Sequence, residues 1–238
     1  VLCAALLEKK LLLLASDTSL LGVVGAGICS LMYPFSWDHV YIPALPHALA
    51  ECTDAPTPFI MGLDRRYRSW VDDFSQLVVV DLDRNAVTCA EMDPLPTLPE
   101  SLVEELLVDL RQHVHPNLSA ISAVSFPKRR MSQDELEAEE AKHMKEARML
   151  FLRFFVELFG TFRTFINDEK SSGSFFHQQQ FLSAQPKESQ EFLDQFLDTQ
   201  AFQIFIEKQV TGDDKEYSLF NDLAERVQQG ERMDSLFP

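Results

Sequence analysis

The sequence predicts an α/β protein, with a three-layer core around a mostly parallel sheet, followed by an all-α C-terminal part. Two observations predict this fold class. Short apolar runs at residues 11–15, 40–42, 59–61 and 77–80 alternate with helical segments, a pattern typical of a parallel sheet covered on both faces. After residue 133, apolar residues instead recur at three- and four-residue steps, as they do on one face of a helix.

The first half of the chain predicts a βαβαβ core. Residues 1–9 read as the end of a helix, and residues 10–15 as the first strand. The helix at residues 20–33 follows a turn in which Asp17, Thr18 or Ser19 can serve as the cap. The strand at residues 77–80 is followed by turn residues, so residues 86–90 are expected to return as a short antiparallel strand.

The second half of the chain predicts a helical domain. A helix is expected from Pro99 to about residue 115, and residues 117–133 form a linker without sustained periodicity. The predicted domains are therefore residues 1–116, a central α/β domain, and residues 134–238, which begin with a long helix. Further helices are expected at residues 175–184 and 188–210. The phenylalanine stripe from Phe151 to Phe165 is interpreted as core, with a partner-binding groove as the alternative.

Composition limits the partners of this chain. A net charge of −16 argues against nucleic acid, which is bound by a surplus of Lys and Arg, and against direct adsorption to anionic membrane. The longest apolar stretch, residues 20–33, is short and interrupted by glycines, so it is interpreted as a buried helix. Four widely spaced cysteines suit a reducing cytosol. Because the chain starts at Val1, within an expected helix and without a methionine or a signal peptide, it is expected to be a piece of a longer protein.

Two motifs imitate ligand sites. The glycines from Gly22 to Gly27 have the order G-x-x-G-x-G and lie inside a helix, whereas a dinucleotide fingerprint needs G-x-G-x-x-G at the strand-to-helix turn. They are interpreted as small residues that let the helix lie close to the sheet. Residues 81–85 resemble the start of a calcium loop, but Ala86 and Met92 stand where that loop needs Gly and Glu. A turn is predicted there, with no metal.

No motif for covalent catalysis is present in the sequence. There is no P-loop, no G-x-S-x-G elbow and no H-E-x-x-H helix, and no cofactor is predicted. Ser132 follows Arg129 and Arg130 in the linker, which is a form that many kinases accept, so Ser132 is a candidate phosphorylation site with plain linker as the alternative.

An ordered series of fragments resembles the central part of a DENN module. The fragments run from Leu31 to Trp37, from His39 to Pro46 and from Ala55 to Gly62, preceded by residues 6–10 and followed by residues 81–85. The helical second half is similar in organisation to the downstream part of such modules. The resemblance implies a guanine-nucleotide exchange factor for a Rab-family small GTPase in membrane traffic, which needs no covalent chemistry of its own. It also implies a cytoplasmic protein, recruited to vesicle or endosomal membranes through partners, with an upstream DENN lobe in the full-length protein.

The GTPase-binding residues are expected where parallel strands end, because binding surfaces gather at the carboxyl ends of such strands. Asp17, Asp64, Arg65 and Tyr67 combine a strand end with polar or aromatic side chains. The alternative is that these four residues are only caps and loop residues.

Two other functions compete with nucleotide exchange. One is a DENN-type scaffold or adaptor without exchange activity, which tethers partners through the Phe-rich helices. The other is a nucleotide-cofactor enzyme on a Rossmann-like core, for which retained NAD or FAD would be the sign; the misplaced glycines count against it.

Overall fold

The computed structural model describes residues 1–89, 94–114, 133–169 and 173–237. The chain forms two compact units, each assembled from two stretches of sequence. The first unit contains Val1–Thr97 and Leu182–Gln209, and the second contains Leu98–Phe181 and Val210–Pro238. Residues 117–132 of the expected linker lie outside the described residues, so the division at that point stays a prediction.

The first unit is built on a five-stranded sheet with the strand order β2-β3-β1-β4-β5. The strands are β1 (Leu11–Ala15), β2 (Val40–Ile42), β3 (Phe59–Asp64), β4 (Val78–Asp81) and β5 (Ala86–Thr88). The strand β1 pairs in parallel with both β3 and β4, and β2 pairs in parallel with β3. Only β5 is antiparallel, to β4. The predicted fold class is confirmed, including the antiparallel return after β4.

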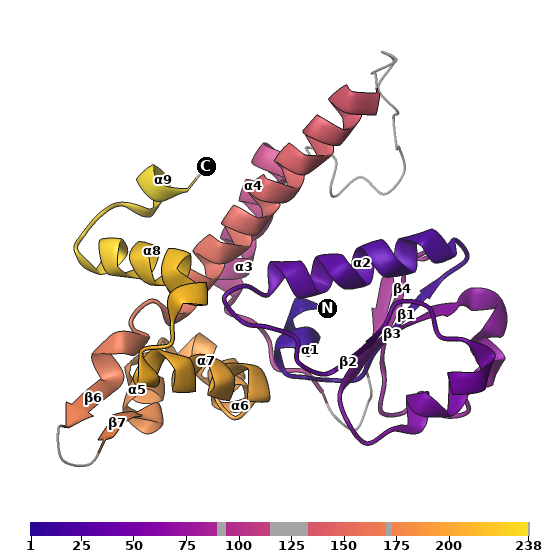
Figure 1. Cartoon of the computed structure of the whole chain (residues 1–238), viewed down its shortest axis with the longest axis horizontal. Helices are drawn as coiled ribbons and strands as arrows, with labels where there is room; N and C mark the ends of the chain where they lie inside the picture. Colours follow the sequence, from indigo (N-terminus) through magenta and orange to yellow (C-terminus); the bar gives the residue numbers. More distant parts are fainter. Residues whose placement is uncertain (90–93, 115–132, 170–172, 238) are drawn as a thin grey trace. The chain divides into compact units, whose positions relative to one another are not determined.

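The two faces of this sheet are covered by different elements. Every residue of β1 is buried, so the strand is apolar on both faces. On one face lies α2 (Thr18–Leu31), as Figure 1 shows. The Cβ atom of Leu21 in this helix lies next to Gly62 of β3. On the other face, Leu12, Leu14 and Met61 form a cluster that also includes Trp70 at the end of η2 (Arg65–Trp70). The remaining elements at the start of this unit are α1 (Leu2–Leu6) and the 3-10 segment η1 (His47–Asp54).

The glycines of α2 have different roles. A Cβ atom at Gly25 would lie 2.6 Å from the ring of Tyr41, and the Tyr41 hydroxyl donates to the carbonyl of Gly22 at 3.0 Å. A Cβ atom at Gly27 would meet nothing within 4 Å. The interpretation that small residues allow close packing therefore holds at Gly25, which faces β2, but not at Gly27.

Two helices from the C-terminal half complete the first unit. The expected single helix at residues 188–210 is divided into α6 (Lys187–Phe196) and α7, which runs over Gln200–Thr211. The break has a local cause, because the Thr199 hydroxyl accepts from the backbone N–H of Phe202 and so acts as a cap. Phe35 packs edge-on against Phe196 and Phe205, with ring centroids 4.7 and 5.2 Å away.

The second unit is helical apart from one hairpin. Its long helix α4 (Gln133–Phe159) contacts α3 (Glu100–Asp109) and α8 (Ser218–Gln228), as Figure 1 shows. The smaller elements are η3 (Leu110–Val114), η4 (Phe162–Phe165), β6 (Ile166–Glu169), β7 (Gly173–Phe176), η5 (Lys215–Tyr217) and α9 (Met233–Leu236). The expected helix at residues 175–184 begins only at Gln178, as α5 (Gln178–Ala184), because residues 173–176 pair with β6.

Most of the phenylalanine stripe lies inside the second unit. Phe155, Phe159 and Phe162 are fully buried, and Phe154 is 2% exposed. Phe159 stacks on Phe181 with ring centroids 6.4 Å apart. The core interpretation is therefore confirmed for these side chains. Within the described part of the chain, no helix combines the length and apolar character that crossing a bilayer requires.

Candidate functional site

The carboxyl ends of three neighbouring strands meet at one edge of the sheet. Because β1 lies between β3 and β4, Ala15 is level with Asp64, and Leu14 is level with Asp81. The segments that leave these strands carry the polar residues from which the binding site was predicted. Four side chains at these ends were expected to contribute: Asp17, Asp64, Arg65 and Tyr67.

Arg65 connects two of these segments. Its guanidinium donates to Asp81, the last residue of β4, and to Asp83 with Nε 2.5 Å from Oδ2. The Asp83 carboxylate in turn accepts from the backbone N–H and the hydroxyl of Ser16, at 2.9 and 2.8 Å. A chain of hydrogen bonds therefore ties the ends of β1, β3 and β4 together. We call Ser16, Arg65, Asp81 and Asp83 the carboxyl-edge cluster.

The charges of this cluster are stabilised by hydrogen bonds. Donation from Arg65, and then from Ser16, lowers the pKa of Asp83 below its ordinary value. The same contact with Asp83, followed by that with Asp81, raises the pKa of Arg65. Both groups therefore carry their charges at neutral pH and form a fixed polar edge.

Asp17 stands beside the cluster and caps α2. Its Oδ1 atom accepts from the backbone N–H and the hydroxyl of Ser19, at 3.0 and 2.7 Å, and these bonds lower the pKa of Asp17. The charge of Asp83 opposes this effect, so the two carboxylates are close enough to repel. Asp17 is exposed, and its carboxylate can be reached from solvent.

Asp64 is only 7% exposed and serves to position Arg66. Its carboxylate accepts from the Arg66 backbone N–H at 2.9 Å and from Nη2 at 2.6 Å, and donation by the Arg66 side chain is the main cause of its lowered pKa. The side chain of Arg66 is 74% exposed. The group that this pair presents to solvent is therefore the guanidinium of Arg66.

Tyr67 belongs to a neighbouring aromatic stack. Its ring is nearly parallel to that of Trp70, with centroids 4.1 Å apart, and His47 meets Trp70 edge-on at 4.7 Å. The guanidinium of Arg66 lies 5.6 Å from the centre of the Tyr67 ring. The four predicted residues thus divide into Arg65 within the cluster, Asp17 beside it, Asp64 beneath Arg66, and Tyr67 in the aromatic stack.

Sequence reasoning missed Ser16, Asp83 and Arg66 as site residues. Asp83 and Ser16 were assigned to turns at strand ends but were not chosen as binding residues. Their pairing depends on the order of the strands, because Ser16 and Asp83 are 67 positions apart in sequence and meet only since β1 and β4 are neighbours in the sheet. An acidic residue two positions past a buried strand was the available signal.

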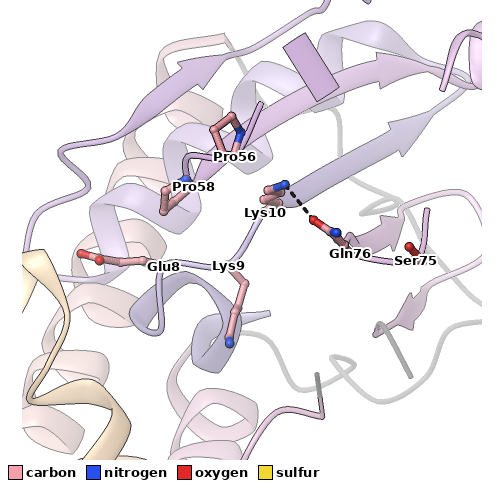
Figure 2. Close-up of a pocket in the computed structure, with 7 residues that line it drawn as sticks. All are labelled: Glu8, Lys9, Lys10, Pro56, Pro58, Ser75 and Gln76. Atoms are coloured by element: carbon pink, nitrogen blue, oxygen red, sulfur yellow. Dashed lines mark hydrogen bonds between the residues drawn. The ribbon is translucent and has the colours of Figure 1, made fainter. Parts of the chain in front are cut away.

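A separate cavity of about 360 Å3 lies at the opposite, amino-terminal edge of the sheet (Figure 2). It is lined by Glu8, Lys9, Lys10, Pro56, Pro58, Ser75 and Gln76. Figure 2 shows the Lys10 ammonium donating to the Gln76 side chain, at 3.2 Å. Glu8 is engaged elsewhere, since its carboxylate accepts from the backbone N–H groups of Gln200 and Ala201. The Ser75 hydroxyl, also in this lining, donates to the Asp73 carboxylate at 2.8 Å.

The remaining predicted site residue cannot be placed. Ser132 lies outside the described residues. Over the part of the chain that the structure describes, no group of three or more His, Cys, Asp or Glu side chains is arranged to hold a metal ion. Asp81 and Asp83, which imitate a calcium loop in the sequence, are instead paired with Arg65.

Comparison with known proteins assigns both ends of the chain. Residues 1–85 match the family model of the DENN (AEX-3) domain, and residues 176–223 match that of the dDENN domain. The DENN domain and WD repeat-containing protein SCD1 of Arabidopsis thaliana is 32% identical over 99% of this chain and 20% of its own length. DENN domain-containing protein 2D of Homo sapiens is 28% identical over 87% of this chain and 41% of its own length.

The matches cover most of this chain but only part of each relative. The chain spans less than half the length of either relative. The two domain models match the chain in the order DENN and then dDENN. The DENN match covers four strands of the five-stranded sheet and ends just before β5. The chain belongs to the DENN-domain family.

Proposed function

We propose that this chain promotes GDP release from a Rab-type small GTPase, which binds at the carboxyl edge of the sheet. The observation that carries the proposal is the pair of domain matches, because DENN-domain proteins are generally Rab exchange factors. The carboxyl edge supports it by offering exposed charges on a rigid scaffold. Recruitment to vesicle or endosomal membranes through partners, and participation of an upstream DENN lobe, belong to the same proposal.

Exchange requires binding that distinguishes two states of the GTPase. A factor that binds the nucleotide-free form more tightly than the GDP-bound form lowers the free-energy barrier to GDP release. Such a factor needs donors and acceptors held in fixed positions against the switch loops, and no acid, base or nucleophile. Arg66, oriented by Asp64, and the capping carboxylate of Asp17 are groups of this kind. Arg65 acts as a positioning residue, since its own guanidinium is engaged by Asp81 and Asp83.

The competing proposal is a DENN-type scaffold without exchange activity. It was expected to tether partners through the Phe-rich helices. The burial of Phe154, Phe155 and Phe159 counts against that route, because buried rings are not available to a partner. A scaffold that uses the carboxyl edge itself is still distinguished from an exchange factor by the kinetics of GDP release.

The test is release of a fluorescent GDP analogue from a panel of purified Rab GTPases, with this chain and with a longer chain that restores an upstream lobe. Faster release from one or a few Rabs is expected. Arg66→Ala and Tyr67→Ala should each slow the accelerated release by about tenfold, the loss of roughly 1.4 kcal/mol of binding. Lys142→Ala, at a side chain that is 70% exposed on α4, should leave it unchanged. Tight binding of a Rab without faster release would establish the scaffold, and no binding by either folded chain would overturn both.

A further inference from the structure

A second cavity, of about 380 Å3, opens beside the outer strands β4 and β5. Its sheet residues share one face, because Leu14 is level with Asp81, Asp81 with Ala86, and Val79 with Thr88. This is the face on which Leu14 and Val79 contribute to the apolar cluster. A cavity of this volume is within the range that proteins use to bind ligands.

The floor of the cavity is apolar. Leu14 and Leu77 are buried, and Phe74 and Val79 are partly buried against the same cluster. Such a surface favours an apolar side chain, because removing both from water is favourable.

The rim of the cavity is basic. Arg65, Arg68 and Arg84 line it, against Asp81 as the one carboxylate among its lining residues. Arg65 is engaged by Asp81 and Asp83, and we call the whole site the arginine-rimmed cavity. The accumulation of three arginines stands out in a chain whose net charge is −16.

In two of these arginines, Arg68 and Arg84, most of the guanidinium N–H groups are not used in short contacts with carboxylates. Arg68 is exposed and its guanidinium lies 4.3 Å from the centre of the Phe74 ring; among the described residues, no carboxylate forms an ion pair with it. Arg84 is 76% exposed and approaches Asp81 only to 3.9 Å. A planar guanidinium with unused N–H groups is suited to bidentate binding of a carboxylate.

The cavity lies next to the edge of the sheet. The strand order puts β5 outermost, and its three residues Ala86, Val87 and Thr88 are all exposed. An edge strand carries backbone N–H and C=O groups on its outer side, and an extended peptide can pair with them.

We propose that the arginine-rimmed cavity binds an extended acidic segment of a partner protein, in which an apolar side chain lies between carboxylates. The apolar side chain would occupy the floor, the carboxylates would accept from Arg68 and Arg84, and the peptide backbone would pair with β5. This proposal does not depend on nucleotide exchange. An anionic membrane shares the carboxylate's charge but has no peptide backbone to pair with β5, so the exposed edge strand favours the peptide.

The test uses the 238-residue chain and fluorescence anisotropy of a short labelled peptide with the central sequence Asp-Leu-Glu-Phe-Asp. Binding is expected to weaken as salt increases and to be lost when the acids are replaced by their amides or the apolar residues by glycine. Arg68→Ala and Arg84→Ala should each weaken it by about tenfold, as expected for one charge-assisted contact. Arg232→Ala is the matched control, because its side chain is also highly exposed, at 85%, and should leave binding unchanged.

A second variant tests the cavity separately from its charge. Ala86→Phe keeps all three arginines and adds a bulky ring to the lining of the cavity on a strand that tolerates aromatic residues. It should remove binding of the acidic peptide while circular dichroism and thermal unfolding remain as in the parent chain. Equal binding of the amide peptide, or binding unaffected by Arg68→Ala and Arg84→Ala, would overturn the proposal. So would binding to vesicles of anionic lipid in the absence of any binding to the peptide.

Discussion

At Gly62, the backbone of β3 lies very close to Pro43, the residue that directly follows β2. A Cβ atom there would collide with the carbonyl oxygen of Pro43 and would lie 2.9 Å from the Cβ of Leu21. The Gly62 carbonyl also accepts from the backbone N–H of Leu45 at 2.7 Å. The backbone at this position is held from several directions, so an added methyl group has no space.

Two glycine variants should therefore change stability in opposite directions. Gly62→Ala should lower the free energy of unfolding by about 1–3 kcal/mol, because the packed backbone must shift to admit the methyl group. Gly27→Ala should raise it by about 0.5–1 kcal/mol, since alanine is the better helix former and no atom lies within 4 Å of the added carbon. Urea unfolding of both variants measures the difference; equal effects would show that the close approach at Gly62 does not exist.

At the carboxyl-edge cluster, the pKa of Asp83 determines a dependence on pH. Because hydrogen bonds from Arg65 and Ser16 lower this pKa in the folded state, the stabilisation is fully present above the ordinary carboxyl range and is lost as pH falls through the lowered value. Asp83→Asn should therefore be less stable than the parent at neutral pH, with the difference shrinking in acid. Unfolding midpoints across a pH series measure this, and Asp72→Asn, at an exposed loop position, should follow the parent curve.

At the scale of elements, one side chain caps a helix that is remote in sequence. Glu8 lies between α1 and β1 with a φ of 52°, and its carboxylate accepts from the backbone N–H groups of Gln200 and Ala201 at 3.0 and 2.7 Å. These are unsatisfied donors of the first turn of α7, and a negative charge there also favours the helix dipole. The DENN and dDENN segments of the first unit are joined by this cap.

Removing the cap should destabilise the first unit. Glu8→Ala should lower the free energy of unfolding by about 1 kcal/mol, the usual value of a helix cap, and should speed amide exchange at the start of α7. Glu8→Gln keeps one acceptor and should cost less. Glu191→Gln, an exposed acid on α6, serves as the control and should leave exchange at Gln200 and Ala201 unchanged.

In the second unit, a single arginine is surrounded by acids from three helices. Arg153 of α4 is 12% exposed and pairs with Glu105 and Asp109 of α3, with Glu157 one turn along, and with Asp234 of α9. Burial raises the pKa of Glu157 despite its bond with Arg153. Glu157 therefore contributes most stability when protonated, and that contribution declines as pH rises through its raised pKa.

Arg153→Met should lower the free energy of unfolding by about 3 kcal/mol at neutral pH, because it leaves neighbouring carboxylates without their cation. The loss should become smaller as pH falls and Glu157 takes up a proton. Thermal unfolding at neutral and mildly acidic pH checks both statements. Arg153→Met with Glu157→Gln should recover part of the neutral-pH loss, and a pH-independent loss would instead indicate packing as the cause.

At the scale of the whole molecule, the two units are interleaved along the chain. Residues 182–209 belong to the unit that holds the sheet, although the second unit contains the sequence on both sides of them. Phe196 and Phe205, both fully buried, supply the partners of Phe35 in the first unit. The helical sequence of the C-terminal half therefore contributes to both cores.

A chain truncated after residue 116, the predicted end of the central domain, should consequently be defective. It retains all five strands but loses the rings that cover Phe35 and the helix that Glu8 caps. We expect it to bind the dye ANS and to unfold with low cooperativity, whereas residues 1–97 joined to residues 182–209 by a flexible linker should not. Cooperative unfolding of the 116-residue chain would contradict the interleaved arrangement.

The sequence by itself determined the family and the class of most elements, but not the hairpin of β6 and β7. Before their terminal acids, β3 and β4 carry apolar side chains on both faces, as β1 does over its whole length, and this pattern is typical of a buried, mostly parallel sheet. The expected phenylalanine core followed from helical periodicity alone. Propensity and periodicity are local, and local patterns are visible in a single sequence. The four predicted binding residues were all chosen by one general rule about strand ends, and their role stays a prediction.

Only the tertiary structure decided which residues come together. The bonds from Arg65 to Asp83 and from Asp83 to Ser16 require β1 to be the neighbour of β4, and the strand order is set by packing across the whole sheet. The same order brings Arg68 and Arg84 to one cavity. The division of the C-terminal helices between two cores is likewise a long-range result, because both groups of helices carry similar apolar faces. Which face is buried against which partner depends on contacts far apart in the chain.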